Sequence, residues 1–444
     1  MAGARAAALE ALLRVDGEEG YSNIVLDSVL KKSSLSQKDS SLATAIFYGV
    51  LERRITLDYI IGLFSKRPAG KLSPAVREIL RMGAYQLFFL KKIPPSAAVN
   101  ESVKLTKKSG EFRASGFVNA VLRNMLRKRE KIRFPDAEKE PLRYRSIYYS
   151  VPEKLIKLWQ ECYGNKCADS ILHGISAKPD IFIRVNNTRI SEQQLIKRLG
   201  DEGIGADVLP WPEHALRVRN PSMLYRSACY SEGLFHVQDI SSQLCSCLIG
   251  AKAGERVFDV CAAPGGKTFT IAEQMKNKGE VLSFDIHPAR TELISNGALR
   301  LGLSAVHAGV RDAADPKGEI GQADRVLCDV PCSGLGVIRR KPEIRYKFPI
   351  AIDSLPDLQY RILCRSSELV RKGGIIIYST CTLNPDENSG VAERFSKNNM
   401  EFEPLPLLLP REISHAVKEP ENQLTLIPQE HGPDGFFISA FRRR

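Results

Sequence analysis

The stretch RVFDVCAAPGGKT, residues 256–268, decides the fold class of the C-terminal half of this chain. It begins as an apolar, strand-like run and passes through two adjacent glycines into a helical pattern. A glycine-rich turn of this kind lets the backbone approach a ligand closely. The turn contains neither G-x-G-x-x-G nor G-x-x-x-x-G-K-[ST], which argues against a dinucleotide fingerprint and a phosphate loop. We therefore expect a nucleoside-type cofactor at a strand-to-helix turn.

Outward from this stretch, strand-length apolar runs alternate with helical patterns to the end of the chain. The further runs are EVLSFDI (280–286), SAVHAG (304–309), DRVLCDV (324–330), GGIIIYST (373–380) and GFFISAF (435–441). Such alternation predicts a mostly parallel sheet that is covered by helices on both faces. In these sheets, ligands bind beyond the carboxyl ends of the strands. We expect an α/β, Rossmann-like domain over residues 235–444, with its site at that edge.

The upstream part of the chain has two further patterns. Apolar residues at three- and four-residue spacings predict an all-helical domain over residues 1–135. Residues 131–145 are charged, contain two prolines and are interpreted as a linker. Residues 146–230 alternate short helical and strand-like patterns, which predicts a small α+β domain. The chain is therefore predicted to be multidomain.

The charge of the chain is concentrated in one region. The 444 residues carry a net charge of +13, and residues 51–150 alone hold 22 Lys and Arg against nine Asp and Glu. This stretch therefore accounts for the whole excess. Such a concentration favours a polyanionic partner, above all nucleic acid. A solvated helical surface is the alternative.

Several classes of protein are excluded by composition. No apolar run approaches the roughly 20 residues that cross a bilayer, and the N-terminus lacks a signal-peptide core. The ten cysteines are too dispersed for a small exported disulfide framework. The pairs Cys162 with Cys167 and Cys245 with Cys247 lack the second ligand pair of a zinc site. We expect a cytoplasmic protein with no metal and no membrane partner, and a monomer by default.

Two carboxylates follow the second and third runs of the predicted sheet. Asp285 ends EVLSFD, where a carboxylate can accept hydrogen bonds from a ribose diol. Capping of the helix that begins at Pro288 is the alternative, but Asp285 lies two residues too early for it. Asp312 lies near the end of the third run, where it could accept from an adenine amino group. Aspartate is also common in loops.

Two cysteines follow the fourth and fifth runs. Cys332 lies in DVPCSG (329–334) and Cys381 in STCT (379–382). Either cysteine alone would favour a buried, inert thiol. Two thiols at neighbouring strand ends, beside a cofactor turn, instead favour one shared crevice. A disulfide between them is disfavoured in a reducing cytosol.

These motifs resemble those of the RNA cytosine-C5 methyltransferases that use S-adenosylmethionine. The motifs that carry the resemblance are VQDISS (237–242), DVCAAPGGKT (259–268), FDIHPAR (284–290), DVPCSGLG (329–336), STCT (379–382) and PDGFF (433–437). The N-terminal part resembles the NusB-type helical RNA-binding module through the R-x-x-A-x-x-x-L pattern at Arg5 and the KKIP…AVNESVKLTK segment. The combination is similar to the bacterial 16S rRNA members of the family. It implies a class I methyltransferase sheet, S-adenosyl-L-methionine as cofactor and 16S ribosomal RNA as partner.

The resemblance also implies roles for individual residues. Cys381 would attack carbon 6 of cytosine, which makes the otherwise unreactive carbon 5 enamine-like. Cys332 would assist loss of the C5 proton and release of the enzyme, and Asp329 would hydrogen-bond the N3/N4 edge of the base. The residues implied to contact the cofactor are Cys261, Ala262, Ala263, Pro264, Gly265, Gly266, Lys267, Asp285, Arg290, Asp312 and Asp329.

Other functions are weighed against this one. Amino-group methyltransferases usually carry N/D-P-P-Y/F at the fourth strand end, where this chain has Asp329-Val330-Pro331-Cys332. A tRNA cytosine-C5 methyltransferase shares the same motifs. A non-catalytic, antitermination-like RNA-binding protein is suggested by the basic helices. A nicotinamide-dependent oxidoreductase is disfavoured because G-x-G-x-x-G is absent.

Overall fold

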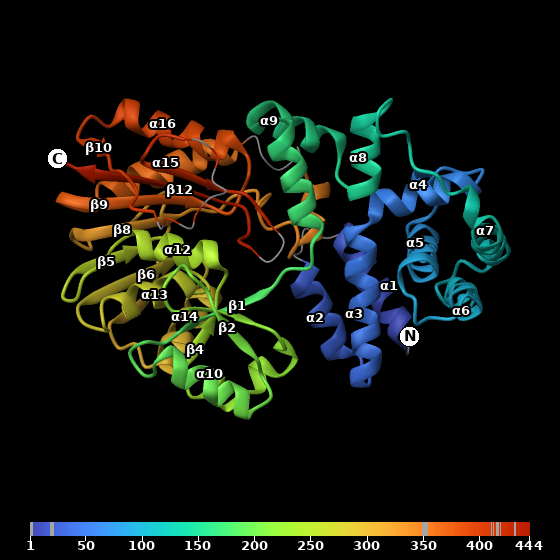
Figure 1. Cartoon of the computed structure of the whole chain (residues 1–444), viewed down its shortest axis with the longest axis horizontal. Coiled ribbons are helices and arrows are strands. Elements are labelled where there is room, and N and C mark those ends of the chain that lie inside the picture. The colour runs from blue at the N-terminus through green and yellow to red at the C-terminus, as the bar shows by residue number, and fades with distance from the viewer. Residues whose placement is uncertain are drawn as a thin grey trace. The chain divides into compact units, whose positions relative to one another are not determined.

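The computed structural model describes residues 3–17, 22–348, 354–409, 411, 413, 417, 419–429 and 432–444. The chain forms two compact units (Figure 1). The helical unit consists of Met1–Glu161 together with Ile338–Phe348, and the sheet unit consists of Cys162–Val337 together with Pro349–Arg444. Within the described ranges, no helix is both long and apolar enough to pass through a lipid bilayer.

The helical unit contains α-helices and short 3-10 turns, as the sequence predicts for its N-terminal part. They are α1 (Ala4–Gly17), α2 (Ser22–Lys32), α3 (Gln37–Glu52), α4 (Arg54–Phe64), η1 (Ala69–Lys71), α5 (Pro74–Phe89), α6 (Pro95–Lys108), η2 (Phe112–Ala114), α7 (Ser115–Arg127), η3 (Arg129–Lys131), α8 (Pro141–Tyr149) and η5 (Pro342–Tyr346). Their apolar stripes meet in one core, where Leu9, Phe47 and Ile79 are fully buried. The helix α9 (Glu153–Ser176) begins in this unit and bends at Gly164, whose φ is 78°.

Proline marks the start of three α-helices in this unit. α5 begins at Pro74, α6 at Pro95 and α8 at Pro141. Proline suits the first turn of a helix because its missing N–H would have no partner there and its φ is already helical. The prediction of a linker over residues 131–145 is therefore wrong at its C-terminal end. Pro141 is a helix-start signal rather than a linker residue.

Residues 338–348 belong to the helical unit, although they lie far from its other residues in the sequence. The Glu343 carboxylate accepts a hydrogen bond from the first amide of α2 at 3.0 Å. The Arg345 guanidinium donates to main-chain oxygens at the C-terminal ends of α3 and α8 over 3.2–3.3 Å. An anion at a helix N-terminus and a cation at helix C-termini both complement the helix dipole. The segment is thus an integral part of the helical packing.

The sheet unit contains a small antiparallel sheet in the order β2-β3-β1-β4. Its elements are β1 (Ile181–Val185), α10 (Glu192–Asp201), β2 (Ala206–Val208), β3 (Ala215–Val218), η4 (Pro221–Arg226), α11 (Ala228–Ser231) and β4 (Phe235–Val237). The buried faces of β1 and α10 share one core that includes Ile183 and Leu195. The predicted small α+β domain is confirmed.

The large sheet has the order β10-β12-β9-β8-β5-β6-β7, with β11 paired to β12. Its strands are β5 (Arg256–Asp259), β6 (Glu280–Asp285), β7 (Val306–Val310), β8 (Ala323–Asp329), β9 (Val370–Thr380), β10 (Phe402–Pro404), β11 (Gln423–Leu426) and β12 (Phe436–Arg443). Its helices are α12 (Ile240–Leu248), α13 (Gly266–Gln274), α14 (Pro288–Leu301), α15 (Leu355–Ser367), η6 (Pro385–Glu387) and α16 (Ser389–Asn398). Strands β5 to β9 are parallel and β12 is antiparallel to β9, which confirms the predicted, mostly parallel sheet.

The sheet is buried on both faces. Neighbouring residues of one strand enter different cores: Val257 packs with α12, α13 and α14, and Phe258 packs with α15 and α16. This follows from the two-residue period of a strand. The chain builds β5, β6 and β7 outward in one direction, and β8 and β9 then lie on the other side of β5. Such a reversal of strand order opens a crevice at the carboxyl ends of β5 and β8.

Candidate active site

The turn after β5 is fixed by its glycines and by a buried carboxylate. Gly265 has φ 109°, and a Cβ there would lie 2.5 Å from the Phe269 ring, so this position requires glycine. Asp259 is 1% exposed and accepts a hydrogen bond from the Thr268 hydroxyl at 2.8 Å. Burial raises the pKa of Asp259 to about 7. The residues of the turn itself are Cys261, Ala262, Ala263, Pro264 and Gly265, and α13 starts with Gly266 and Lys267.

Asp285 and Arg290 connect this turn to the end of β6. The Asp285 carboxylate is 4% exposed and pairs with the Arg290 guanidinium at 3.2 Å. Arg290 also donates to the main-chain oxygen of Ala263 at 2.9 Å. The residue that caps α14 is His287, whose amide donates to Asp285 at 3.0 Å. Asp285 therefore supports the helix start from outside the cap position, and it retains lone pairs for a ligand.

Asp312 lies two residues beyond β7 and is half-buried. Its carboxylate accepts a hydrogen bond from the amide of Ala314 at 2.8 Å. This is the local turn chemistry for which aspartate is common in loops. The contact occupies part of one carboxylate oxygen and leaves the other oxygen available to a ligand.

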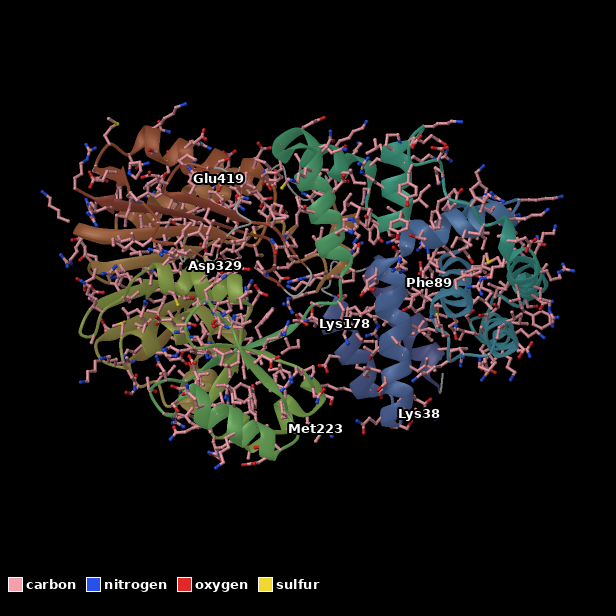
Figure 2. All side chains as sticks on the ribbon, viewed as in Figure 1. Lys38, Phe89, Lys178, Met223, Asp329 and Glu419 are labelled. Carbon is pink, nitrogen blue, oxygen red and sulfur yellow. The ribbon has the colours of Figure 1, made fainter. Side chains whose placement is uncertain are left out.

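An ion pair between Asp329 and Lys267 connects the end of β8 with α13 (Asp329 is labelled in Figure 2). The Lys267 ammonium lies 2.7 Å from Asp329, and the Ser379 hydroxyl donates to the other carboxylate oxygen at 2.8 Å. Burial alone would lower the pKa of Lys267, but the Asp329 carboxylate outweighs it and raises that pKa. The Lys267 side chain is therefore charged near neutral pH.

The sulfurs of Cys332 and Cys381 lie 3.2 Å apart, although 49 residues separate them in the chain. Both side chains are half-buried, so the pair is partly accessible. The hydrogen bond with Cys381 and burial raise the pKa of Cys332 well above its ordinary value. The two loops are joined by the Gly336 amide, which donates to the main-chain oxygen of Cys381 at 3.0 Å. We call these residues, with Asp329 and Lys267, the cysteine site.

The other thiols of this unit differ from this pair. Burial raises the pKa of Cys245 and of Cys328 to about 12, and both side chains lie in the apolar core. Burial also raises the pKa of the half-buried Cys261. Burial thus disfavours the thiolate form of each of these three cysteines.

Glu387 holds the two cysteine loops together, and no sequence motif indicated it. Its carboxylate is fully buried and accepts a hydrogen bond from the Ser333 amide at 2.9 Å. The same carboxylate accepts from the side chains of Gln359 at 2.9 Å and Asn384 at 3.0 Å. The Ser333 hydroxyl is a further donor. Only the fold brings these donors together, and the local sequence around Glu387 carries no pattern that predicts them.

Three family models match successive parts of the chain. They are the NusB family over residues 2–127, the RsmF/B-like methyltransferase ferredoxin-like domain over 151–224, and the 16S rRNA methyltransferase RsmB/F over 246–442. Their order agrees with the observed fold: a helical part, a small antiparallel sheet and a large parallel sheet. The predicted combination of fold classes is therefore confirmed.

Curated relatives match the full length of the chain. The "Probable ribosomal RNA small subunit methyltransferase B" of Bacillus subtilis (strain 168) is 38% identical, over 98% of each chain. The "Ribosomal RNA small subunit methyltransferase B" of Klebsiella pneumoniae (strain 342) is 31% identical, over 96% of this chain and 95% of the relative.

Solved structures show the same architecture. PH0851 superposes with a TM-score of 0.82 and 25% identity over 98% of each chain. A methyltransferase homolog protein from Pyrococcus horikoshii gives a TM-score of 0.59 with 28% identity, over 68% of this chain and 99% of the other. NSun6 from the same organism, in a structure with SFG, gives 0.60 with 21% identity over 66% and 98% of the two chains, and shows the likeness in fold.

Proposed function

Since this chain belongs to the 16S rRNA methyltransferase RsmB/F family, we propose that it transfers a methyl group from S-adenosyl-L-methionine to carbon 5 of a cytosine in 16S ribosomal RNA. One observation supports this chemistry above all others: the 3.2 Å separation of the Cys332 and Cys381 sulfurs beside the Asp329–Lys267 pair. A covalent mechanism at a ring carbon needs a nucleophile and a second group that moves a proton. We further propose a cytoplasmic location.

The strand ends suit the proposed cofactor. S-adenosyl-L-methionine supplies an electrophilic methyl group on a positively charged sulfur. Its hydroxyls, amines and positive charge call for acceptors, and the carboxylates of Asp285, Asp312 and Asp329 lie at or just beyond the ends of three strands of the large sheet. The turn from Cys261 to Lys267 would line the remaining side, and Arg290 would fix Asp285 against that turn.

Cys381 is the proposed nucleophile. Attack of its thiolate on carbon 6 forms the S–C6 bond and makes carbon 5 nucleophilic enough to take the methyl group. The Lys267 ammonium interacts electrostatically with Cys381 and favours a thiolate there. Loss of the C5 proton then returns its electron pair to the ring and expels the thiolate from carbon 6. The net products are 5-methylcytosine, demethylated cofactor and one proton.

Cys332 is the proposed base for the C5 proton. In the free enzyme, its hydrogen bond with Cys381 and its burial raise its pKa, so it is a neutral thiol that can donate to a Cys381 thiolate. When Cys381 is bonded to carbon 6, its sulfur is uncharged, so the interaction with Cys381 no longer raises the pKa of Cys332. Cys332 then ionises more readily, at the step where a base is required.

Asp329 is the proposed anchor for the base. As a carboxylate it accepts hydrogen bonds only, so it can receive the exocyclic amino group at N4 of cytosine. Ser379 and Lys267 already fix its orientation. A base that reaches Cys381 must leave its stack, which favours an unpaired or weakly paired nucleotide. The same geometry would serve a tRNA cytosine, which is therefore the second candidate substrate.

Replacement of Cys381 tests the proposal. Full-length Cys381→Ala is incubated with 16S rRNA and the cofactor, and the methylated nucleosides are identified by mass spectrometry. We expect 5-methylcytidine from the wild type and a loss on the order of 10⁴-fold in the variant, as for other nucleophiles. Cys162→Ala, at an exposed thiol of the same unit, is the matched control. Unchanged turnover, or methylation at N4, would contradict the proposed chemistry, and tRNA in the same assay tests the second substrate.

A further inference from the structure

A groove on the helical unit, of about 660 Å³, lies between the C-terminal end of α4 and the length of α7. Both helices belong to the same compact unit and contact each other (Figure 1). We call it the α4–α7 groove. Two aromatic rings and four cationic side chains contribute to its lining: Phe64, Phe117, Lys66, Arg67, Arg123 and Arg127.

Helical geometry explains why α7 contributes to a groove as well as to the core. Val118, Val121, Leu122 and Met125 are buried in the core of the unit. Residues 120, 123, 124 and 127 follow the spacing of one helix face, and they line the groove. The core is complete without the arginines of that face, so the fold does not require them.

The four cations of the groove have no ion pair among the described residues. Lys66, Arg67, Arg123 and Arg127 are exposed, and the one side-chain hydrogen bond found for them runs from Arg123 to the amide oxygen of Asn119 at 2.9 Å. Other arginines of the same unit are paired: Arg54 and Arg77 with Asp16, and Arg81 with Asp58 and Glu78. Carboxylates thus neutralise these three arginines, whereas the charge of this groove is uncompensated among the described residues.

Unpaired cations beside aromatic rings suit one class of ligand. Lysine and arginine neutralise backbone phosphates, and half-buried rings such as Phe64 and Phe117 can stack on bases. A duplex hides the faces of its bases, whereas single-stranded RNA exposes them. An acidic peptide would use the cations but would leave the rings without a matching group.

We propose that the α4–α7 groove binds a single-stranded segment of the RNA substrate, separately from the base that reaches the cysteine site. This deepens the proposed function and rests on it for the identity of the RNA. The four cations hold the phosphates, and Phe64 and Phe117 stack on bases. The groove therefore sets RNA affinity and the cysteine site sets the chemistry.

The double variant Arg123→Ala/Arg127→Ala tests the proposal in the full-length protein. The probe is a fluorescein-labelled, 20-nucleotide single-stranded RNA, measured by anisotropy at several salt concentrations without cofactor. Loss of two phosphate contacts should weaken binding about tenfold and reduce the slope of log K against log salt by about 1.4. The matched control is Lys32→Ala/Lys38→Ala, which removes from α2 and α3 two exposed cations that have no ion pair within the described part of the chain (Lys38 is labelled in Figure 2).

Two further variants separate charge from stacking. Arg123→Lys/Arg127→Lys should restore the salt slope, because the charges return. Phe117→Leu keeps an apolar side chain but removes the π-face, and should weaken single-strand binding several-fold with the slope unchanged. The same oligonucleotide annealed to its complement should bind all these variants and the wild type nearly alike.

Three outcomes would overturn the proposal: unchanged affinity in Arg123→Ala/Arg127→Ala, an equal loss in the Lys32/Lys38 control, or an equal loss for the duplex. These measurements need no turnover, so they are independent of the test on Cys381. With 16S rRNA as substrate, the arginine variant should raise KM and leave kcat unchanged. A fall in kcat alone would also contradict a role in affinity.

Discussion

The cysteine site and the α4–α7 groove differ in whether their charged side chains are paired. In the cysteine site, Lys267 is paired with Asp329, and beside that site the buried Glu387 accepts hydrogen bonds from several donors. In the groove, four exposed cations have no ion pair among the described residues. The charged side chains of the first region form internal contacts, whereas those of the groove remain available to a partner.

The difference follows from what each region is proposed to do. Bond making requires groups whose orientation is fixed before the substrate arrives, and a buried charge without a partner would be strongly destabilising. Phosphate binding gains free energy from displaced counterions, so its cations work best when they are solvated and unpaired. Charges near the chemistry should therefore control rate, and charges in the groove should control affinity.

After the replacement of Cys381, that of Cys332 should give the largest effect, and it tests whether the cysteine site acts on rate alone. Cys332→Ala should lose turnover by about 10³-fold or more, because the C5 proton has no base. The step before it remains possible, so a protein–RNA adduct that survives denaturing electrophoresis should accumulate. Affinity for the 20-nucleotide RNA should be unchanged. The absence of an adduct in Cys332→Ala, or its persistence in Cys332→Ala/Cys381→Ala, would contradict the assigned roles.

Arg345 lies in the same unit as the arginines of the groove but differs from them in burial and in hydrogen bonding. It is 2% exposed and donates to carbonyl oxygens at the ends of α3 and α8. Arg345→Met should destabilise the helical unit by about 2–4 kcal/mol, because these buried acceptors lose a charged donor. Arg123→Ala/Arg127→Ala should leave its stability nearly unchanged. Hydrogen exchange of the amides of α3 and α8 measures the stability of both variants. Equal protection in the two variants would show that Arg345 contributes no more to stability than the arginines of the groove.

Replacement of Glu387 tests whether a buried anion beside the cysteine site positions the reacting groups. The donors around it face two carboxylate oxygens, so Glu387→Gln would turn an NH₂ group toward donors. We expect kcat to fall about 30-fold, with KM for RNA little changed, because the PCSG loop shifts relative to Cys381. Glu393→Gln, on the exposed side of α16, is the control. A rise in KM of the same size, with kcat unchanged, would instead indicate that Glu387 contributes to RNA binding.

Local patterns in the sequence predicted the strands, the helices and the edge of the sheet where the site would lie. The two-residue period and the motif order were enough to place Cys332 and Cys381 at neighbouring strand ends, where the structure puts their sulfurs 3.2 Å apart. Their catalytic roles stay predictions. Local chemistry also explains Asp312, whose contact with the Ala314 amide is the loop alternative considered for it.

Features that depend on distant packing could not be predicted in this way. Glu387 is surrounded by donors from three separate segments, and residues 338–348 complete the helical unit from far along the chain. The α4–α7 groove needs two helices to meet, although each helix alone reads as an ordinary amphipathic segment. The charge count predicted a basic surface, and only the fold showed which of its cations are unpaired.

The last expected effect is a pH dependence of the stability of the sheet unit. Asp259 has a pKa of about 7 in the folded protein, raised by burial from an ordinary 3.8, so the folded state holds its proton more tightly. Its contribution to stability is therefore complete below about pH 4 and is lost as pH rises through 7, by at most about 1.4 kcal/mol per pH unit. Asp259→Asn should lack this loss. Unfolding midpoints of the two proteins between pH 5 and 8 measure the difference, and parallel profiles would show that Asp259 is ionised in the fold.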